Sequence, residues 1–156
     1  MDNNKKVPVI GFYGYSKSGK TTLIKQEIIR LSKKGVKIGV IKNTNETISV
    51  ESDGKDTQLF RESGAEITSF STPIETSFCL SGNMPVNEII DIINKICNID
   101  LIVVEGARDP SLPKIRIGNR PLRKNTLLTF SGNLQEIQKI IDTLLQEKGE
   151  VDEDIG

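Results

Sequence analysis

One short stretch constrains the fold of this chain more than any other. Residues 14–22, GYSKSGKTT, fit the pattern Gly-x-x-x-x-Gly-Lys-Thr at every fixed position. The apolar run VPVIGFYG, residues 7–14, predicts a preceding strand, and the amphipathic run KTTLIKQEIIRLSKKG, residues 20–35, predicts a following helix. The apolar positions of this helix recur at helical spacing: Leu23, Ile24, Ile28 and Leu31. A strand, a tight glycine turn and a helix in this order predict a phosphate-binding loop, because backbone N–H groups converge where the helix dipole is positive.

Each fixed residue of this glycine loop (residues 14–22) has a physical task. Gly14 and Gly19 allow the backbone to approach a ligand closely. We expect Lys20 to reach the β- and γ-phosphates and the Thr21 hydroxyl to coordinate Mg²⁺, as in a Walker A loop. The predicted nucleotide-binding residues are Gly14, Tyr15, Ser16, Lys17, Ser18, Gly19, Lys20, Thr21 and Thr22. A glycine-serine turn that matches by chance is the alternative, and the flanking strand and helix argue against it.

A second candidate group lies at the end of the apolar run LIVVEG. Glu105 closes this run, and nucleoside triphosphatases place a carboxylate at such a strand end, close to the metal. A solvated strand-end carboxylate is the competing interpretation. The chain has no Asn-Lys-x-Asp loop after a strand, so its motifs leave GTP and ATP both open.

Composition narrows the function further. The chain of 156 residues has the length of one domain, which we expect to span residues 1–156 with a frayed acidic tail at about 149–156. The 21 basic and 21 acidic residues balance, which argues against non-specific nucleic-acid binding, and the absence of histidine excludes imidazole chemistry. Cys79 and Cys97 stand far apart in apolar surroundings and are expected to be core residues of a reduced protein. No apolar run is as long as a membrane-spanning helix, which needs about 20 residues, so we expect a cytoplasmic protein.

Apolar runs alternate with amphipathic stretches along the chain, a rhythm typical of an α/β fold. The pattern predicts a P-loop NTPase fold, with a mainly parallel sheet flanked by helices and an added β-hairpin or edge strands. Further predicted strands are VKIGVIK, AEITSFST, ETSFCL, a central strand DLIVVEG, an edge strand in LPKIRIGNRPLRKN, and TLLTF. Further predicted helices are KDTQLFRESG, PVNEIIDIINKIC with Ile89, Ile92, Ile93 and Ile96 on one face, and NLQEIQKIIDTLLQEKG.

Four segments together resemble the molybdopterin-guanine dinucleotide biosynthesis protein B family, usually called MobB. They are GYSKSGKTTL, VIKNTN, GKDTQLFRESGAE and VVEGARDPSLPKI, in the order of the family. The resemblance implies a homodimeric GTP-binding protein with weak GTPase activity. Such a protein works beside the guanylyltransferase that joins GMP to molybdopterin, and molybdopterin itself is a possible ligand.

The resemblance also assigns roles to particular residues. It places Lys42 at the nucleotide edge of the second strand and makes Asp56 a candidate for the metal or the attacking water. It makes Lys20, Glu105 and Asp56 the candidate catalytic residues, and Thr21, Glu105 and Asp56 the candidate metal ligands. On residue type alone, an aspartate before a helix is more often an N-cap.

The chain departs from the family at a few positions. Asn43 and Asn45 stand where the family typically has histidines, and Glu51 stands where it often has aspartate. Asparagine keeps the hydrogen bonding of imidazole but cannot become a cation. Arg61 and Glu62 match the family and are expected on the helix behind Asp56.

A basic segment near the C-terminal third leaves two interpretations open. Its cationic residues are Lys114, Arg116, Arg120, Arg123 and Lys124. They are either solvated or gather anionic phosphate. The alternative function is a P-loop small-molecule or nucleoside kinase, in which Glu105 or Asp56 is the base and residues 116–123 form a closing lid. A metal-insertion NTPase fits less well, because soft or imidazole ligands are scarce.

Overall fold

The computed structural model describes residues 6–48 and 56–153, with the side chains of residues 148–153 left aside. The chain divides into two compact units, one of Met1–Thr44 and Val86–Gly156 and one of Asn45–Pro85. Each is described by itself. The expectation of a single domain over the whole chain remains a prediction.

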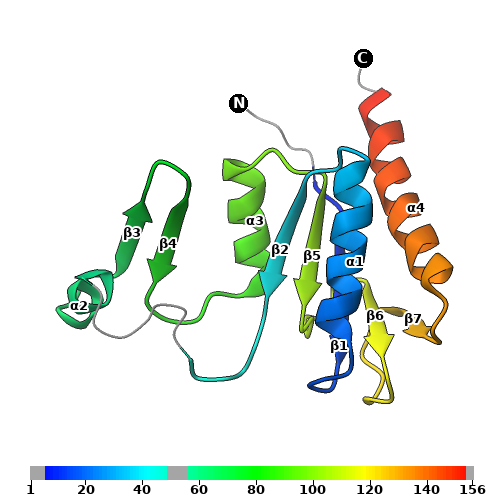
Figure 1. Cartoon of the computed structure of the whole chain (residues 1–156), viewed down its shortest axis with the longest axis horizontal. Coiled ribbons are helices and arrows are strands. Elements are labelled where there is room, and N and C mark those ends of the chain that lie inside the picture. The colour runs from blue at the N-terminus through cyan, green and yellow to red at the C-terminus, as the bar shows by residue number, and fades with distance from the viewer. Residues whose placement is uncertain (1–5, 49–55, 154–156) are drawn as a thin grey trace. The chain divides into compact units, whose positions relative to one another are not determined.

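The larger unit contains a five-stranded sheet in the order β2-β5-β1-β6-β7 (Figure 1). All four strand pairs are parallel. The strands are β1 (Val9–Gly14), β2 (Ile38–Lys42), β5 (Leu101–Glu105), β6 (Lys114–Ile117) and β7 (Thr126–Phe130). The helices of this unit are α1 (Lys20–Lys33), α3 (Val86–Ile96) and α4 (Leu134–Glu153). The predicted mainly parallel sheet with flanking helices is confirmed.

Helices cover both faces of this sheet. On one face, Leu23 and Leu31 of α1 and Ile137 of α4 pack with Ile10 and Phe12 of β1. On the opposite face, Val86 and Ile90 of α3 pack with Ile102 and Val104 of β5. The apolar run of β5 serves both layers because successive side chains of a strand point to opposite faces.

The smaller unit contains α2 (Asp56–Glu62), β3 (Ile67–Ser71) and β4 (Thr76–Leu80). The two strands pair antiparallel, with Ile67 opposite Leu80 and Ser71 opposite Thr76, and form the hairpin that the sequence predicted. Glu51, one of the departures from the family, lies outside the described part of the chain.

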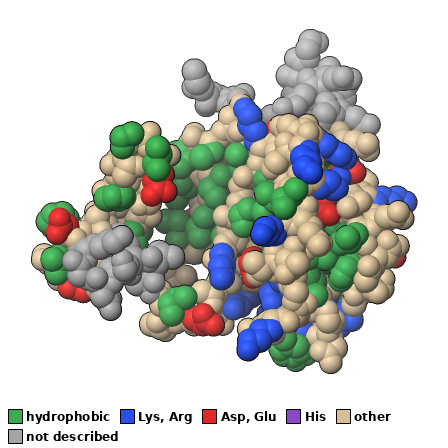
Figure 2. Space-filling view, in the orientation of Figure 1, with side chains coloured by type: hydrophobic (Ala, Val, Ile, Leu, Met, Phe, Trp, Pro, Cys, Tyr) green, Lys and Arg blue, Asp and Glu red, His purple; other side chains and the backbone are tan. Residues whose placement is uncertain are grey.

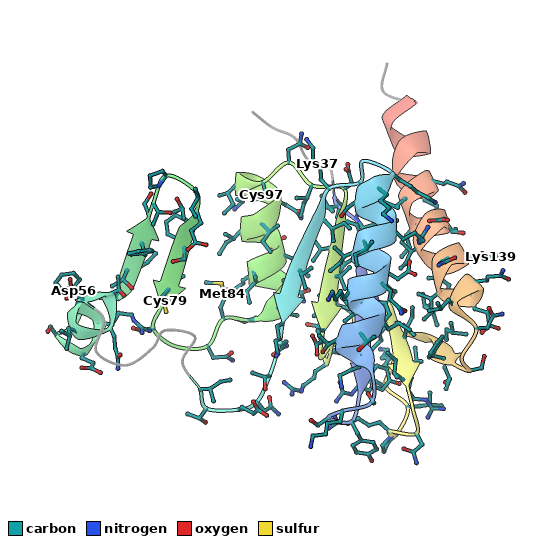
Figure 3. The ribbon with its side chains drawn as sticks, in the orientation of Figure 1. Lys37, Asp56, Cys79, Met84, Cys97 and Lys139 are labelled. Atoms are coloured by element: carbon teal, nitrogen blue, oxygen red, sulfur yellow. The ribbon has the colours of Figure 1, made fainter. Side chains whose placement is uncertain are left out.

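Four sequence predictions need correction or refinement. The strand β6 is not an edge strand, because it lies between β1 and β7. On α3, Ile90 is buried whereas Ile92 and Ile96 are exposed, so the buried stripe is shifted from the predicted face. Cys97 is exposed and Cys79 half-buried, so neither is a core residue; Figure 3 shows them on different elements. The helix α4 runs to Glu153, further than its predicted end.

No helix among the described residues is long and apolar enough to cross a membrane.

Candidate functional site

The candidate site lies where the strands of the five-stranded sheet end. Phe12 of β1 and Lys42 of β2 both align with Glu105 of β5, so three neighbouring parallel strands end at the same edge. After β1 the chain enters α1, which packs on one face of the sheet. After β5 it continues into a segment whose Ala107 packs in the core on the opposite face. Such a switch point between neighbouring strands is where open α/β sheets bind ligands.

The glycine loop joins β1 to α1 at this switch point. Gly14 ends β1 so close to its neighbour that a Cβ would collide with the carbonyl oxygen of Ile117. Gly19 takes φ 88° and begins α1, and no side chain caps that helix end. An uncapped helix N-terminus without acidic residues in its first turn presents backbone N–H groups and a positive dipole to an anion.

Lys20 folds back across the loop that it follows. Its Nζ donates to the carbonyl oxygens of Tyr15 at 2.5 Å and Gly14 at 3.3 Å, and to Ser18 Oγ at 3.4 Å. The ammonium group therefore lies against the turn, and the Lys20 side chain is half-buried. It is placed where a phosphate bound by the loop would meet it.

Thr21 and Glu105 meet across the site. Thr21 Oγ1 donates to Glu105 Oε1 at 3.1 Å, although the two residues stand 84 positions apart. Both are hard oxygen donors, the kind that Mg²⁺ prefers. Among the described residues no group of three or more His, Cys, Asp or Glu side chains forms a cage for a metal. A cation here would therefore complete its coordination with phosphate oxygens and water.

The residues that follow β2 and β5 are in close backbone contact. The Asn43 N–H donates to the Glu105 carbonyl at 2.8 Å. Gly106 takes φ 80° and passes so close to the Asn43 carbonyl that a Cβ would collide with it. Arg108 Nη1 donates to Asn43 Oδ1 at 3.4 Å, so this asparagine, a family departure, uses its amide oxygen to engage a cation. Lys42, the last residue of β2, is exposed beside them, and its role at a nucleotide remains a prediction.

Lys114 is a buried cation rather than a ligand-binding one. It is fully buried, and its Nζ donates to the carbonyl oxygens of Asp109, Leu112 and Lys124 at 2.6 to 2.8 Å. Burial lowers its pKa below the ordinary value. The solvated interpretation is therefore wrong for this residue, and Lys114 joins the segments before β6 and β7.

Two arginines of the basic segment flank β1. Arg120 Nη1 donates to the Gly14 carbonyl at 3.3 Å, and its guanidinium lies 5.3 Å from the centre of the Tyr15 ring. Arg123 Nη1 donates to the Ala107 carbonyl at 2.5 Å and lies 4.8 Å from the centre of the Tyr13 ring. Burial, and then the positive charges of Arg120 and Arg108, lower the pKa of Arg123.

These arginines concentrate positive charge at the site. Figure 2 shows Lys and Arg side chains over much of the visible face of the larger unit, and some of them lie at the lower edge, where the strands end in Figure 1. Sequence reasoning singled out Arg120 and Arg123 but missed Arg108 and Tyr13. The signal for Arg108 was its place directly after Glu105-Gly106-Ala107.

The larger unit thus brings together most of the predicted site residues. The glycine loop, Lys42 and Glu105 share one edge of the sheet. Asp56, by contrast, begins α2 in the smaller unit, with Arg61 and Glu62 on the same helix (Figure 3). A role for Asp56 at the nucleotide remains a prediction.

The sheet order and the strand–loop–helix unit at its centre define a P-loop NTPase fold. The chain belongs to the family described as molybdopterin guanine dinucleotide synthesis protein B (MobB), whose model matches residues 9–143.

Relatives of known name agree with this assignment. A putative molybdopterin-guanine dinucleotide biosynthesis adapter protein of Methanocaldococcus jannaschii is 40% identical over 145 residues, covering 85% of this chain but only 60% of its own length. The adapter protein of that name from Escherichia coli is 30% identical over 131 residues, covering 78% of this chain and 74% of its own. The crystal structure of Bacillus subtilis MobB superimposes with a TM-score of 0.70 at 17% identity, over 86% of this chain and 96% of that one, and supports the fold.

Proposed function

We propose that this protein is a GTP-binding adapter of molybdenum cofactor biosynthesis. It binds Mg²⁺-GTP through the glycine loop, hydrolyses it slowly and assists the guanylyltransferase that makes molybdopterin guanine dinucleotide. The contact of 3.1 Å between Thr21 Oγ1 and Glu105 Oε1, next to Lys20, is the single observation that carries this proposal.

The binding step rests on the groups at the glycine loop. The N-terminal end of α1 receives the phosphates, and Lys20 exchanges its loop carbonyl partners for phosphate oxygens. The exchange is favourable because a charged acceptor makes a stronger hydrogen bond than a neutral one.

Thr21 and Glu105 supply the oxygen donors for the cation. A Mg²⁺ ion held there would supply positive charge against the charge that builds up during hydrolysis. Thr21 would offer its hydroxyl to the cation, and Glu105 accepts a hydrogen bond from that hydroxyl and would orient it. Asp56 is proposed as a further ligand or as the group that positions the attacking water.

The adapter role is supported by the printed names of relatives in Methanocaldococcus jannaschii and Escherichia coli. The guanine half of the dinucleotide in those names favours GTP as the ligand. The partner would be the guanylyltransferase, and molybdopterin is a possible second ligand. By the family resemblance we also expect a cytoplasmic homodimer, which should sediment at twice the mass of one chain.

Product analysis and a pull-down test the two parts of the proposal. With Mg²⁺-GTP we expect slow release of GDP and phosphate and no phosphorylated acceptor, and weaker turnover of ATP. The immobilised protein should retain purified guanylyltransferase of the same source. A phosphorylated small molecule among the products, or failure to retain the transferase, contradicts the adapter function.

A further inference from the structure

Arg120 and Lys20 converge on one carbonyl oxygen. Lys20 Nζ and Arg120 Nη1 each lie 3.3 Å from the oxygen of Gly14, the first residue of the glycine loop. The two cationic nitrogens are therefore at most twice 3.3 Å apart. A phosphate group of ordinary size reaches both at this spacing, since its oxygens accept hydrogen bonds in several directions.

The backbone around Arg120 is held from β1 and β6. Arg116 Nη1 donates to the Arg120 carbonyl at 3.0 Å, and the Arg123 N–H donates to Tyr13 Oη at 3.0 Å. Lys114 Nζ holds the Lys124 carbonyl at 2.8 Å. Because Tyr13 and Lys114 are buried, the loop of residues 118–125 is fixed by the core and presents Arg120 in a defined place.

The side chain of Arg120 is held weakly by comparison. It is half-buried, and its contacts are the long hydrogen bond to Gly14 and the face of Tyr15. In the described part of the chain it makes no ion pair, since the recorded pairs involve other residues. The nearby cations Arg108 and Arg123 add to the positive charge. A bound polyanion would relieve their mutual repulsion.

We propose that Arg120 binds the terminal phosphate of the nucleoside triphosphate together with Lys20, as an arginine supplied by the same chain. This inference rests on the proposed function. On binding, the guanidinium exchanges the Gly14 carbonyl for a phosphate oxygen and keeps its contact with Tyr15. Arg120 thereby distinguishes a triphosphate from a diphosphate, which lacks the group that it contacts.

The test compares affinities for Mg²⁺ with a non-hydrolysable GTP analogue and for Mg²⁺ with GDP. We expect Arg120→Ala to weaken binding of the analogue about 10-fold or more, and to change GDP affinity less than about 2-fold, because one charge-assisted contact is lost from the triphosphate alone. Arg120→Lys should recover part of the loss. Lys95→Ala removes one exposed positive charge from the last turn of α3, outside the basic segment, so both affinities should stay unchanged.

The outcomes separate this inference from the function on which it rests. If Arg120→Ala weakens both nucleotides equally, Arg120 only supports the loop, and the inference is overturned. It is also overturned if neither affinity changes while the wild-type protein binds the analogue. If the wild-type protein binds neither nucleotide, the proposed function and the inference fall together. Thermal unfolding of each variant shows that a change in affinity does not come from a loss of fold.

Discussion

At the scale of single residues, the contact between Glu105 and Thr21 is central to the candidate site. Their contact joins the end of β5 to the first turn of α1, and its two oxygens are the best candidates for holding a cation. The neighbouring Asn43 and Gly106 fix the backbone on which Glu105 stands. The role of this carboxylate can therefore be tested by a substitution that keeps its shape.

We expect Glu105→Gln to leave GTP affinity within a few-fold of wild type and to slow hydrolysis about 10-fold or more. The amide keeps a hydrogen bond to Thr21 but no longer attracts Mg²⁺ or its water. Steady-state phosphate release measures the effect. Glu88→Gln, an exposed change in the first turn of α3, is the matched control and should leave turnover unchanged. Unaltered turnover in Glu105→Gln would make this carboxylate structural and Asp56 the next to test.

Asp109 is expected to make the free energy of unfolding depend on pH in the acid range. Hydrogen bonds from the Ser111 hydroxyl at 2.6 Å and from its N–H at 2.8 Å lower the pKa of Asp109 below its ordinary value of about 3.8. The folded protein therefore gains stability from this carboxylate above pH 3.8, and loses it as the pH falls through the lowered pKa. Asp109→Asn should reduce stability at neutral pH and flatten its decline in acid. Denaturant unfolding at several pH values measures this, and an equally steep acid decline in the variant contradicts it.

At the scale of elements, α1 and α4 are joined by a partly buried charge network. Arg30 donates to the buried Glu27 at 2.8 Å and to Asp142 of α4 at 3.0 Å. Gln138 of α4 donates to Glu27 at 3.2 Å. The Glu27 side chain is nearly inaccessible to solvent, so these hydrogen bonds and the Arg30 guanidinium offset the cost of burying it.

We expect Arg30→Met to lower the free energy of unfolding by about 2 kcal/mol or more, since a buried carboxylate loses its counter-charge. Lys34→Ala is the control. Lys34 lies 3.7 Å from Asp142 but is exposed, so its loss should cost less than about 1 kcal/mol. Chemical denaturation of both variants gives the comparison. Similar small losses in the two would show that the network contributes little.

The elements were largely predictable because their signals are local. The helix α1 follows from the spacing of Leu23, Ile24 and Leu31, and the buried strand β5 follows from its unbroken apolar run. The position of β6 inside the sheet was not predictable, because polar residues surround its short apolar pattern. Its Lys114 is buried because carbonyl groups of the loops before and after β6 fold around the ammonium group, which the residue type alone does not reveal.

The candidate site was predictable where a motif spans neighbouring residues, as in the glycine loop. Thr21 and Glu105 are each predicted as metal ligands, but the direct hydrogen bond between them is a finding of the structure. The meeting of Arg108 with Asn43, and of Arg120 with Gly14, depends on how separate loops fold back to the same edge. No local pattern carries that information.

At the scale of the whole molecule, the residues to which the family resemblance assigns roles are distributed over both units. The larger unit holds the glycine loop and Glu105, and the smaller unit holds Asp56 on α2 and the hairpin. The family model spans both units, which is expected if the family keeps them together for one function. The adapter proposal depends on nucleotide binding at the glycine loop of the larger unit.

Calorimetric titration of the wild-type protein and of Lys20→Ala with Mg²⁺ and a GTP analogue tests this central claim most directly. The wild-type protein should bind one nucleotide per chain, more tightly than the ATP analogue and only weakly without Mg²⁺. Lys20→Ala should remove binding, because this ammonium lies against the loop, while the exposed Lys25→Ala on the next turn of α1 should not. Equal affinity in wild type and Lys20→Ala, or no heat of binding in either, would contradict the assignment of the glycine loop as the nucleotide site.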